Sequence, residues 1–219
     1  MSHRIVAMRL DHVSYAAGPD GLAATAERIG KLLGREFTDG GIHPRFGTRN
    51  MTLGLAGDTY IEIVEVLDHP ASDKAPFGQA VRARSALGGG WLGWVVAVGD
   101  LSRIERRLGR EAVKGSRHRP DGTELVWKQL GVNGLIADPQ LPFFVHWDSP
   151  RELHPGAGAD QAFSLACLEI AGDPHRVSEW LGEPIEEPLE DLKVEWVAPH
   201  GTPGLLAVQV QTPDGLVRI

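Results

Sequence analysis

Apolar and polar positions alternate in a unit that recurs three times along the chain. Each copy starts with an apolar run, passes through an Asp into a short amphipathic stretch, and ends in Leu-Gly. Apolar residues at helical spacing between a capping residue and a Gly predict a helix that lies on a sheet. The apolar runs are residues 10–15, 94–98 and 165–170, and the Leu-Gly pairs are residues 33–34, 108–109 and 181–182.

Strand-like segments follow each predicted helix, so the expected order is βαβββ in each copy. This order predicts an α+β protein of three modules, over residues 6–68, 91–150 and 160–219. Two stretches rich in Pro and Gly, residues 68–90 and 149–160, are predicted to be linkers. The expected later strands are residues 37–42, 51–55 and 60–66, then 112–115, 124–130 and 142–147, then 193–198, 205–211 and 216–219.

Composition narrows the class of partner. The chain has 219 residues, 42% apolar content and a net charge of -7. Because no basic run is present, we expect neither nucleic acid nor a membrane surface as partner. The single cysteine, Cys167, excludes an intrachain disulfide framework and a cysteine-cluster metal site. The first residues lack an apolar leader pattern and no segment approaches a membrane span, which predicts a cytoplasmic protein.

Several local motifs point to one family when they are taken together. They are LDHV at residues 10–13, GIHP at 41–44, GTRN at 47–50, YIEI at 60–63 and LPFFVHWD at 141–148. Their order and spacing resemble the glyoxalase-like branch of the vicinal oxygen chelate superfamily over residues 8–150. The third module shares only the βαβββ outline.

The resemblance implies a fold and a metal site. Two tandem modules of this superfamily curl into a half-open mixed-sheet barrel with a cleft, and metal ligands come from the first and fourth strand of each module. The matching positions here are His12, Glu62 and His146, with Gly93 at the fourth position. Two imidazoles and one carboxylate suit Zn, Fe, Mn, Co or Ni.

The residues themselves leave alternatives open. Glu62 lies between Ile61 and Ile63, so it points to the opposite face of its strand, and a charge there is costly unless it is solvated, paired or metal-bound. It could equally be an exposed carboxylate on a half-solvated sheet. His12 could hydrogen-bond the backbone, and His146 could donate to Asp148.

Other polar residues are candidates for catalysis or substrate binding. His43, expected in a loop at the cleft mouth, and Glu62 could each move a proton. Asn50, Arg119 and Trp147 could contact substrate. Arg117, like Arg119, carries a planar guanidinium group that could bind a substrate carboxylate. Each of these polar side chains could instead be solvated.

Two functions are therefore expected from different classes of protein. The first is a glyoxalase-like metalloenzyme of the isomerase, lyase or oxygenase type that acts on a small oxygenated substrate. The second is a metal-free small-molecule binding protein of the bleomycin-resistance type, which would have Trp91, Trp94 and Trp147 in the cleft. The resemblance to the superfamily also predicts a homodimer.

Overall fold

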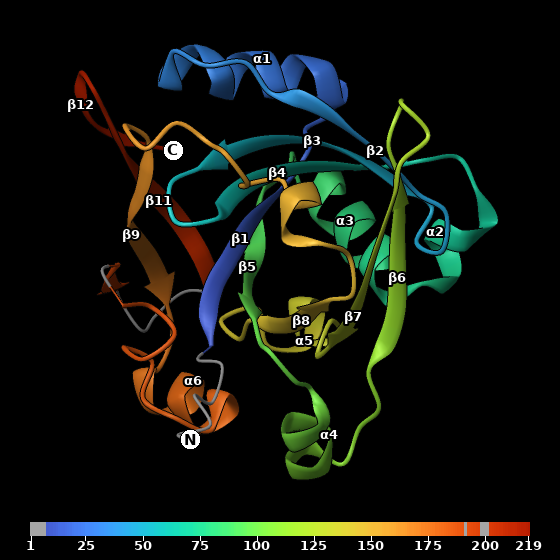
Figure 1. The fold of residues 1–219 in the computed structure, drawn as a ribbon, viewed down its shortest axis with the longest axis vertical. Coiled ribbons are helices and arrows are strands. Elements are labelled where there is room, and N and C mark those ends of the chain that lie inside the picture. Colours follow the sequence, from blue (N-terminus) through green and yellow to red (C-terminus); the bar gives the residue numbers. More distant parts are fainter. Residues whose placement is uncertain (1–7, 191, 198–201) are drawn as a thin grey trace.

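The chain folds into a closed eight-stranded barrel with a four-stranded sheet beside it (Figure 1). The computed structural model describes residues 8–190, 192–197 and 202–219. Parts of the first and third predicted modules, residues 6–7, 191 and 198–201, lie outside the described residues. The predicted α+β class and mixed-sheet barrel are confirmed, but the barrel is closed and not half-open.

Two sets of four strands build the barrel, and both sets pair in the same way. The strands β1 and β4 pair in parallel, as do β5 and β8, and antiparallel neighbours complete each set. Antiparallel pairing of β1 with β5 and of β2 with β6 closes the barrel. The elements are β1 (Arg9–Ala16), α1 (Gly21–Leu33), β2 (Thr38–His43), β3 (Thr48–Leu55) and β4 (Thr59–Val66), then β5 (Gly90–Ala97), α4 (Ser102–Leu108), β6 (Val113–His118), β7 (Glu124–Leu130), α5 (Gly134–Ala137) and β8 (Phe143–Trp147).

Side-chain alternation along β4 separates the barrel interior from the outer core. Ile61 and Ile63 are fully buried in the outer apolar cluster, which includes Ile29 and Leu33 of α1. Helix α1 covers this outer side of the sheet (Figure 1). Glu62 therefore points to the interior, because successive strand residues face opposite sides.

The predicted Leu-Gly helix ends occur at α1, α4 and α6 (Pro174–Leu181). The glycines that follow, Gly34, Gly109 and Gly182, have φ angles of 65°, 61° and 81°, a left-handed conformation that glycine adopts without a Cβ penalty. Asp20, the Asp that precedes the first of these helices, makes no capping hydrogen bond at α1. Of the helices in the described ranges, none is long and apolar enough to cross a membrane.

The first predicted linker is wrong, because it contains two helices, α2 (Pro70–Lys74) and α3 (Pro76–Ala86). Both prolines occupy the first turn of a helix, where the missing N–H costs nothing. Helix α3 inserts Phe77 and Val81 into the apolar cluster of the barrel interior. The insertion therefore helps to shape the interior of the barrel.

The third module keeps the βαβββ order but pairs its strands differently. Its strands are β9 (Ser164–Ala171), β10 (Lys193–Val197), β11 (Gly204–Thr212) and β12 (Gly215–Arg218), with α6 after β9. β9 pairs in parallel with β10, the strand after its helix, whereas β1 and β5 pair with the last strand of their sets. This sheet joins the outer cluster beside β5 (Figure 1). Element order therefore recurs three times, but the pairing recurs twice.

Candidate functional site

A small cavity of about 30 Å³ lies inside the barrel. Its polar lining consists of His12, His43, Glu62, Arg117 and Gln129, and its remaining wall is largely aromatic. A single water molecule needs about 10–15 Å³ of such space, so the cavity has room for about two waters. The charged and imidazole groups therefore face one confined volume.

Glu62 is the central charged group of this cavity. Its carboxylate accepts hydrogen bonds of 2.7 Å from Ser14 Oγ and from Asn50 Nδ2. The Nε2 atoms of His12 and His43 lie 3.9 and 4.0 Å from its two oxygens. Burial raises the pKa of the Glu62 carboxyl, but the two histidines and the two hydrogen bonds outweigh burial and lower the pKa below its ordinary value. Glu62 is therefore a buried, ionised carboxylate.

His12 is oriented by Asp11, the residue beside it on β1. His12 Nδ1 lies 2.8 Å from Asp11 Oδ2. An ionised carboxylate can only accept, so Nδ1 carries a proton and Nε2 faces the cavity. Burial raises the pKa of Asp11, but the hydrogen bonds and charges of His12 and His154 hold it well below its usual range.

Strict alternation would place these two neighbours on opposite faces of β1. The pairing of β1 with β5 shifts register between Leu10 and His12, and such a bulge re-aims a side chain. Both Asp11 and His12 are consequently buried, with exposed fractions of 0% and 5%. The sequence carries no signal for this bulge, so Asp11 could not be selected in advance.

His43 ends β2 and is not in a solvated loop. Its Nδ1 lies 2.8 Å from Thr48 Oγ1, and its side chain is buried. Burial is the main reason that its pKa falls to about 4; Arg117 and His12 also lower it, and Glu62 opposes them. The imidazole is therefore neutral at neutral pH.

His146 does not join this group, and the metal site expected from His12, Glu62 and His146 is not assembled. Val145 and Trp147 line the cavity, so His146, between them on β8, faces away. It lies 3.1 Å from the carbonyl of Val98.

No group of three or more His, Cys, Asp or Glu among the described residues is arranged to hold a metal ion. At Gly93, the fourth position expected for a metal ligand, Leu135 occupies the space that a side chain would need. A Cβ at Gly93 would lie 2.7 Å from Leu135 Cδ2. The donor set therefore does not fit the metal centre that the resemblance implied.

Of the residues expected to bind substrate, Trp147 lines the cavity and Arg119 lies at the surface. Asn50 and Trp147 are beside Glu62 and Asp11, to which they donate hydrogen bonds. Arg119 lies in a surface pocket of about 450 Å³ and donates to the Leu153 carbonyl.

Arg117 lines both the cavity and this surface pocket. It is 2% exposed. Burial is the main cause that lowers the pKa of its guanidinium. Arg117 therefore separates the inner cavity from the outer pocket.

Of the tryptophans expected in the cleft, only Trp147 lines the cavity. Trp91 and Trp94 belong to the outer apolar cluster, where their indole nitrogens donate to the carbonyls of Ile219 and Gln140. Trp127, which was not expected in the cleft, lines the cavity instead. The wall is aromatic, but two of its expected members face the other side of the sheet.

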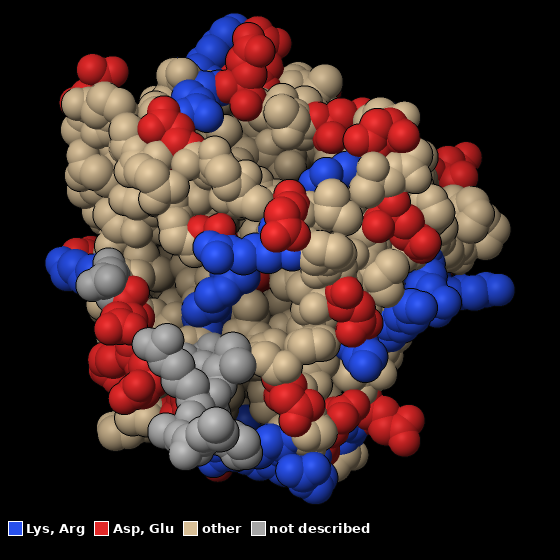
Figure 2. Space-filling view, in the orientation of Figure 1, with Lys and Arg blue, Asp and Glu red and all other residues tan. Residues whose placement is uncertain are grey.

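The second predicted linker, residues 149–160, packs against the cavity wall, where the His154 ring lies 5.4 and 5.2 Å from the rings of Tyr60 and Trp147. It crosses the centre of the face shown in Figure 1 and contains the short helix η1 (Arg151–Leu153). His154 donates from Nε2 to Asp11 Oδ1 at 3.1 Å, because its Nδ1 accepts from the Gly156 N–H. Lys and Arg side chains gather near the centre of the same face (Figure 2). The segment is thus tied to the carboxylate that orients His12.

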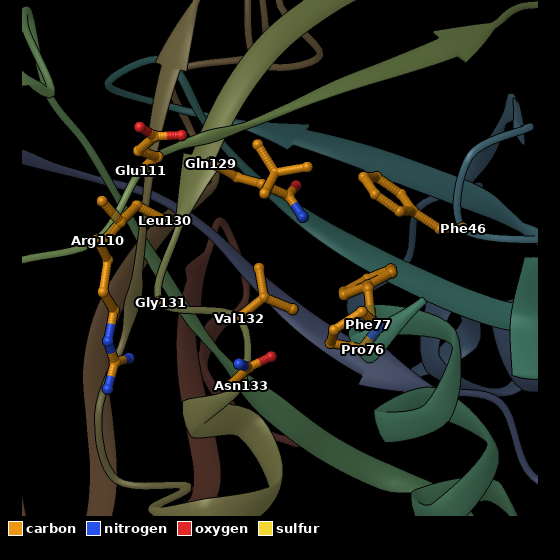
Figure 3. Close-up of a pocket in the computed structure, with 11 residues that line it drawn as sticks. Phe46, Pro76, Phe77, Arg110, Glu111, Gln129, Leu130, Gly131, Val132 and Asn133 are labelled. Atoms are coloured by element: carbon orange, nitrogen blue, oxygen red, sulfur yellow. The ribbon is translucent and has the colours of Figure 1, made fainter. Parts of the chain in front are cut away.

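An apolar hollow of about 140 Å³ adjoins the cavity at Phe46, Phe77 and Gln129. Figure 3 shows the two phenylalanine rings facing Gln129 and Val132 across this hollow. The cavity therefore has a polar pocket on the side of Arg117 and an apolar hollow beside Phe46.

Comparison with known proteins identifies the family. A family model described as a glyoxalase-like domain matches residues 10–185. The chain belongs to the glyoxalase-like domain family. The resemblance to the glyoxalase-like branch of the vicinal oxygen chelate superfamily is thereby confirmed. No curated protein matches this glyoxalase-like sequence.

Solved structures share its fold at low identity. A hypothetical protein from Staphylococcus aureus is 16% identical with a TM-score of 0.58, and the match covers 97% of this chain and 85% of that chain. Methylmalonyl-CoA epimerase from Mycobacterium tuberculosis is 19% identical with a TM-score of 0.45, and the match covers 69% of this chain and 95% of that chain. A Streptomyces coelicolor methylmalonyl-CoA epimerase variant in complex with 2-nitronate-propionyl-CoA is 17% identical with a TM-score of 0.43, and the match covers 65% of this chain and 99% of that chain. The match to the Staphylococcus aureus protein supports a common fold, and it carries no information about activity.

Proposed function

We propose that this glyoxalase-like protein is an isomerase or lyase that acts on a small oxygenated molecule through proton transfer at Glu62. The supporting observation is the buried carboxylate with two imidazoles, His12 and His43, within 4.0 Å of its oxygens. Burying a charge beside a cavity costs free energy, and perturbed titratable groups in such places are typical of catalytic sites.

In the proposed step, Glu62 removes a proton from a carbon next to a carbonyl or carboxylate group. The electron pair of the broken C–H bond forms a carbon–carbon double bond, and the carbonyl electron pair moves to oxygen; the product is an enolate, or an enediolate where the deprotonated carbon carries a hydroxyl. Neutral His43 donates a hydrogen bond from Nε2 to that oxygen when its Nδ1 accepts from the Thr48 hydroxyl. In an isomerisation the proton returns to the former carbonyl carbon, while the hydroxyl on the deprotonated carbon becomes the new carbonyl and its proton passes to the oxygen of the former one. In a lyase reaction the carbonyl re-forms instead, and a leaving group on the next carbon departs with its bonding electron pair.

A divalent metal ion, of Zn, Fe, Mn, Co or Ni, stays a prediction of the family resemblance. We assign it no step, because the described residues offer no three-ligand group. Elemental analysis of protein purified without chelator tests this point. Stoichiometric metal that is lost in His12→Ala would restore the metalloenzyme hypothesis.

A binding protein without catalysis is the second candidate. The aromatic wall, with Trp127 and Trp147 in tilted contact at 5.5 Å between ring centroids, favours it. The cavity of about 30 Å³ argues against a large apolar ligand unless the barrel opens. Binding of a small molecule with no chemical change would support this candidate.

Solvent deuterium exchange is the experiment that tests the proposed reaction. Protein in D₂O is incubated with hydroxyacetone, pyruvate and lactate, and the loss of the C–H signal is followed by proton NMR. We expect exchange with at least one compound, and a rate lower by about 10²-fold or more in Glu62→Gln. Absence of protein-dependent exchange across the panel, or an unchanged rate in Glu62→Gln, would refute the proposal.

A small-molecule ligand, a homodimer and a cytoplasmic location complete the proposal. Light scattering tests the homodimer, and a monomer mass would reject it. Cell fractionation tests the location.

A further inference from the structure

Arg117 is a buried cation without a described partner. Its Nε is buried and has no hydrogen-bond partner, and it forms no ion pair with any acid in the described part of the chain. A guanidinium has five donors and keeps its charge in proteins, so leaving it buried and unpaired is costly. Since it lines both the inner cavity and the outer pocket, an anion from outside can reach it.

A second unsatisfied group lies beside it. Asn50 donates from Nδ2 to Glu62, which fixes the orientation of the amide because a carboxylate only accepts. The other end of that amide, Asn50 Oδ1, is buried and has no partner. A Cβ at Gly40 would lie 2.1 Å from this oxygen and 3.1 Å from a terminal nitrogen of Arg117. The absence of a side chain at Gly40 therefore lets the two unsatisfied groups lie close together.

These groups define complementary ligand chemistry. Arg117 requires an acceptor with negative charge, and its planar fork suits a carboxylate. Asn50 Oδ1 requires a donor, such as a hydroxyl group. The Glu62 carboxylate that holds Asn50 is the proposed base, so a ligand that satisfies both groups also lies beside that base.

We propose that the substrate is a small 2-hydroxy carboxylate, with its carboxylate on Arg117 and its hydroxyl on Asn50 Oδ1. This inference rests on the proposed function for the reaction that follows binding, but binding itself is independent of Glu62 chemistry. The ligand binds in the polar pocket of about 450 Å³ that Gly40 and Arg117 line, because the inner cavity of about 30 Å³ has room for only about two waters.

The test is calorimetric titration with glycolate and lactate, with lactamide as the uncharged analogue. Loss of one partner of a buried hydrogen-bonded charge pair costs at least about 2 kcal/mol, which is about 30-fold in Kd. We therefore expect lactamide to bind the parent protein about 30-fold or more weakly than lactate. Arg117→Met is expected to weaken lactate to a similar extent, and Arg117→Lys to weaken it less.

Matched controls separate binding from folding. Arg176→Met removes an exposed arginine of α6 and is expected to bind lactate as the parent does. Without ligand, Arg117→Met is expected to melt no lower than the parent, because it removes an unpaired buried charge. Failure of both carboxylates to bind, equal affinity for lactate and lactamide, or unchanged affinity in Arg117→Met would each overturn the inference.

The same ligands distinguish this inference from the proposed function. Lactate that binds through Arg117 but shows no Glu62-dependent exchange would support the substrate class and refute the proton transfer. Exchange that depends on Glu62 but occurs only with hydroxyacetone, and equally in Arg117→Met, would do the reverse.

Discussion

The titration of His43 predicts how the stability of the protein depends on pH. Its pKa is about 4 in the folded protein against 6.5 for an ordinary histidine, mainly because burial disfavours the charged imidazolium. Between these two pH values the unfolded chain binds a proton that the folded protein does not. Stability therefore falls as pH decreases from 6.5 toward 4, and it is unaffected by His43 at higher pH.

The size of the effect follows from the same two pKa values. Integrating the proton-linkage relation gives a loss of about 2 kcal/mol between pH 8 and pH 5. The lowered pKa values of Asp11 and Glu62 act mainly below this range, where stability falls as pH drops below their unfolded values of 3.8 and 4.5. Urea unfolding at pH 8, 6.5 and 5 measures the loss directly.

Substitution assigns the effect to this residue. His43→Gln removes the titrating group, and we expect its free energy of unfolding to be nearly constant from pH 8 to pH 5. The matched control is His175→Gln, at an exposed position of α6, which is expected to keep the parent's slope. A parent protein without this slope, or a His43→Gln protein that retains it, would refute the reasoning.

Three further predictions concern the rest of the site. Asp11→Asn replaces a carboxylate oxygen by a donor facing His12, His154 and Trp147, and is expected to cost about 3–5 kcal/mol by urea unfolding; a cost within experimental error would contradict it. Gly93→His is expected to cost about 1–3 kcal/mol because Leu135 occupies its space, and Leu135→Ala added to it should recover part of that cost. After dialysis, His146→Ala is expected to retain as much Zn, Mn, Fe, Co or Ni as the parent, because His146 faces away from the cavity, and elemental analysis checks this.

The sequence predicted those features of the fold that depend on residues close together in the chain. The Leu-Gly pairs mark the ends of three helices, because the chain there adopts a left-handed conformation that glycine favours. Alternation along residues 60–66 separates Glu62 from Ile61 and Ile63, which face the outer core. Pro70 and Pro76 were misinterpreted, because proline marks the first turn of a helix as readily as it marks a linker.

Long-range relations could not be predicted in the same way. Alternation along β8 does not show which face of the strand lies inside the barrel. His146 was therefore assigned to the cleft, whereas its neighbours Val145 and Trp147 line the cavity. The bulge that brings Asp11 beside His12 depends on pairing with β5, a distant strand. Element order did not determine that β9 pairs with β10, since pairing depends on the neighbours that each sheet edge meets.

Proton exchange in D₂O, compared between the parent protein and Glu62→Gln, tests the central claim most directly. The comparison uses lactate, pyruvate and hydroxyacetone, and calorimetry shows whether the variant still binds the responsive compound. The account predicts exchange in the parent and a rate lower by about 10²-fold or more in Glu62→Gln, with binding retained. Equal exchange in the two proteins, or ligand binding without exchange in the parent, would contradict a role for Glu62 as the base.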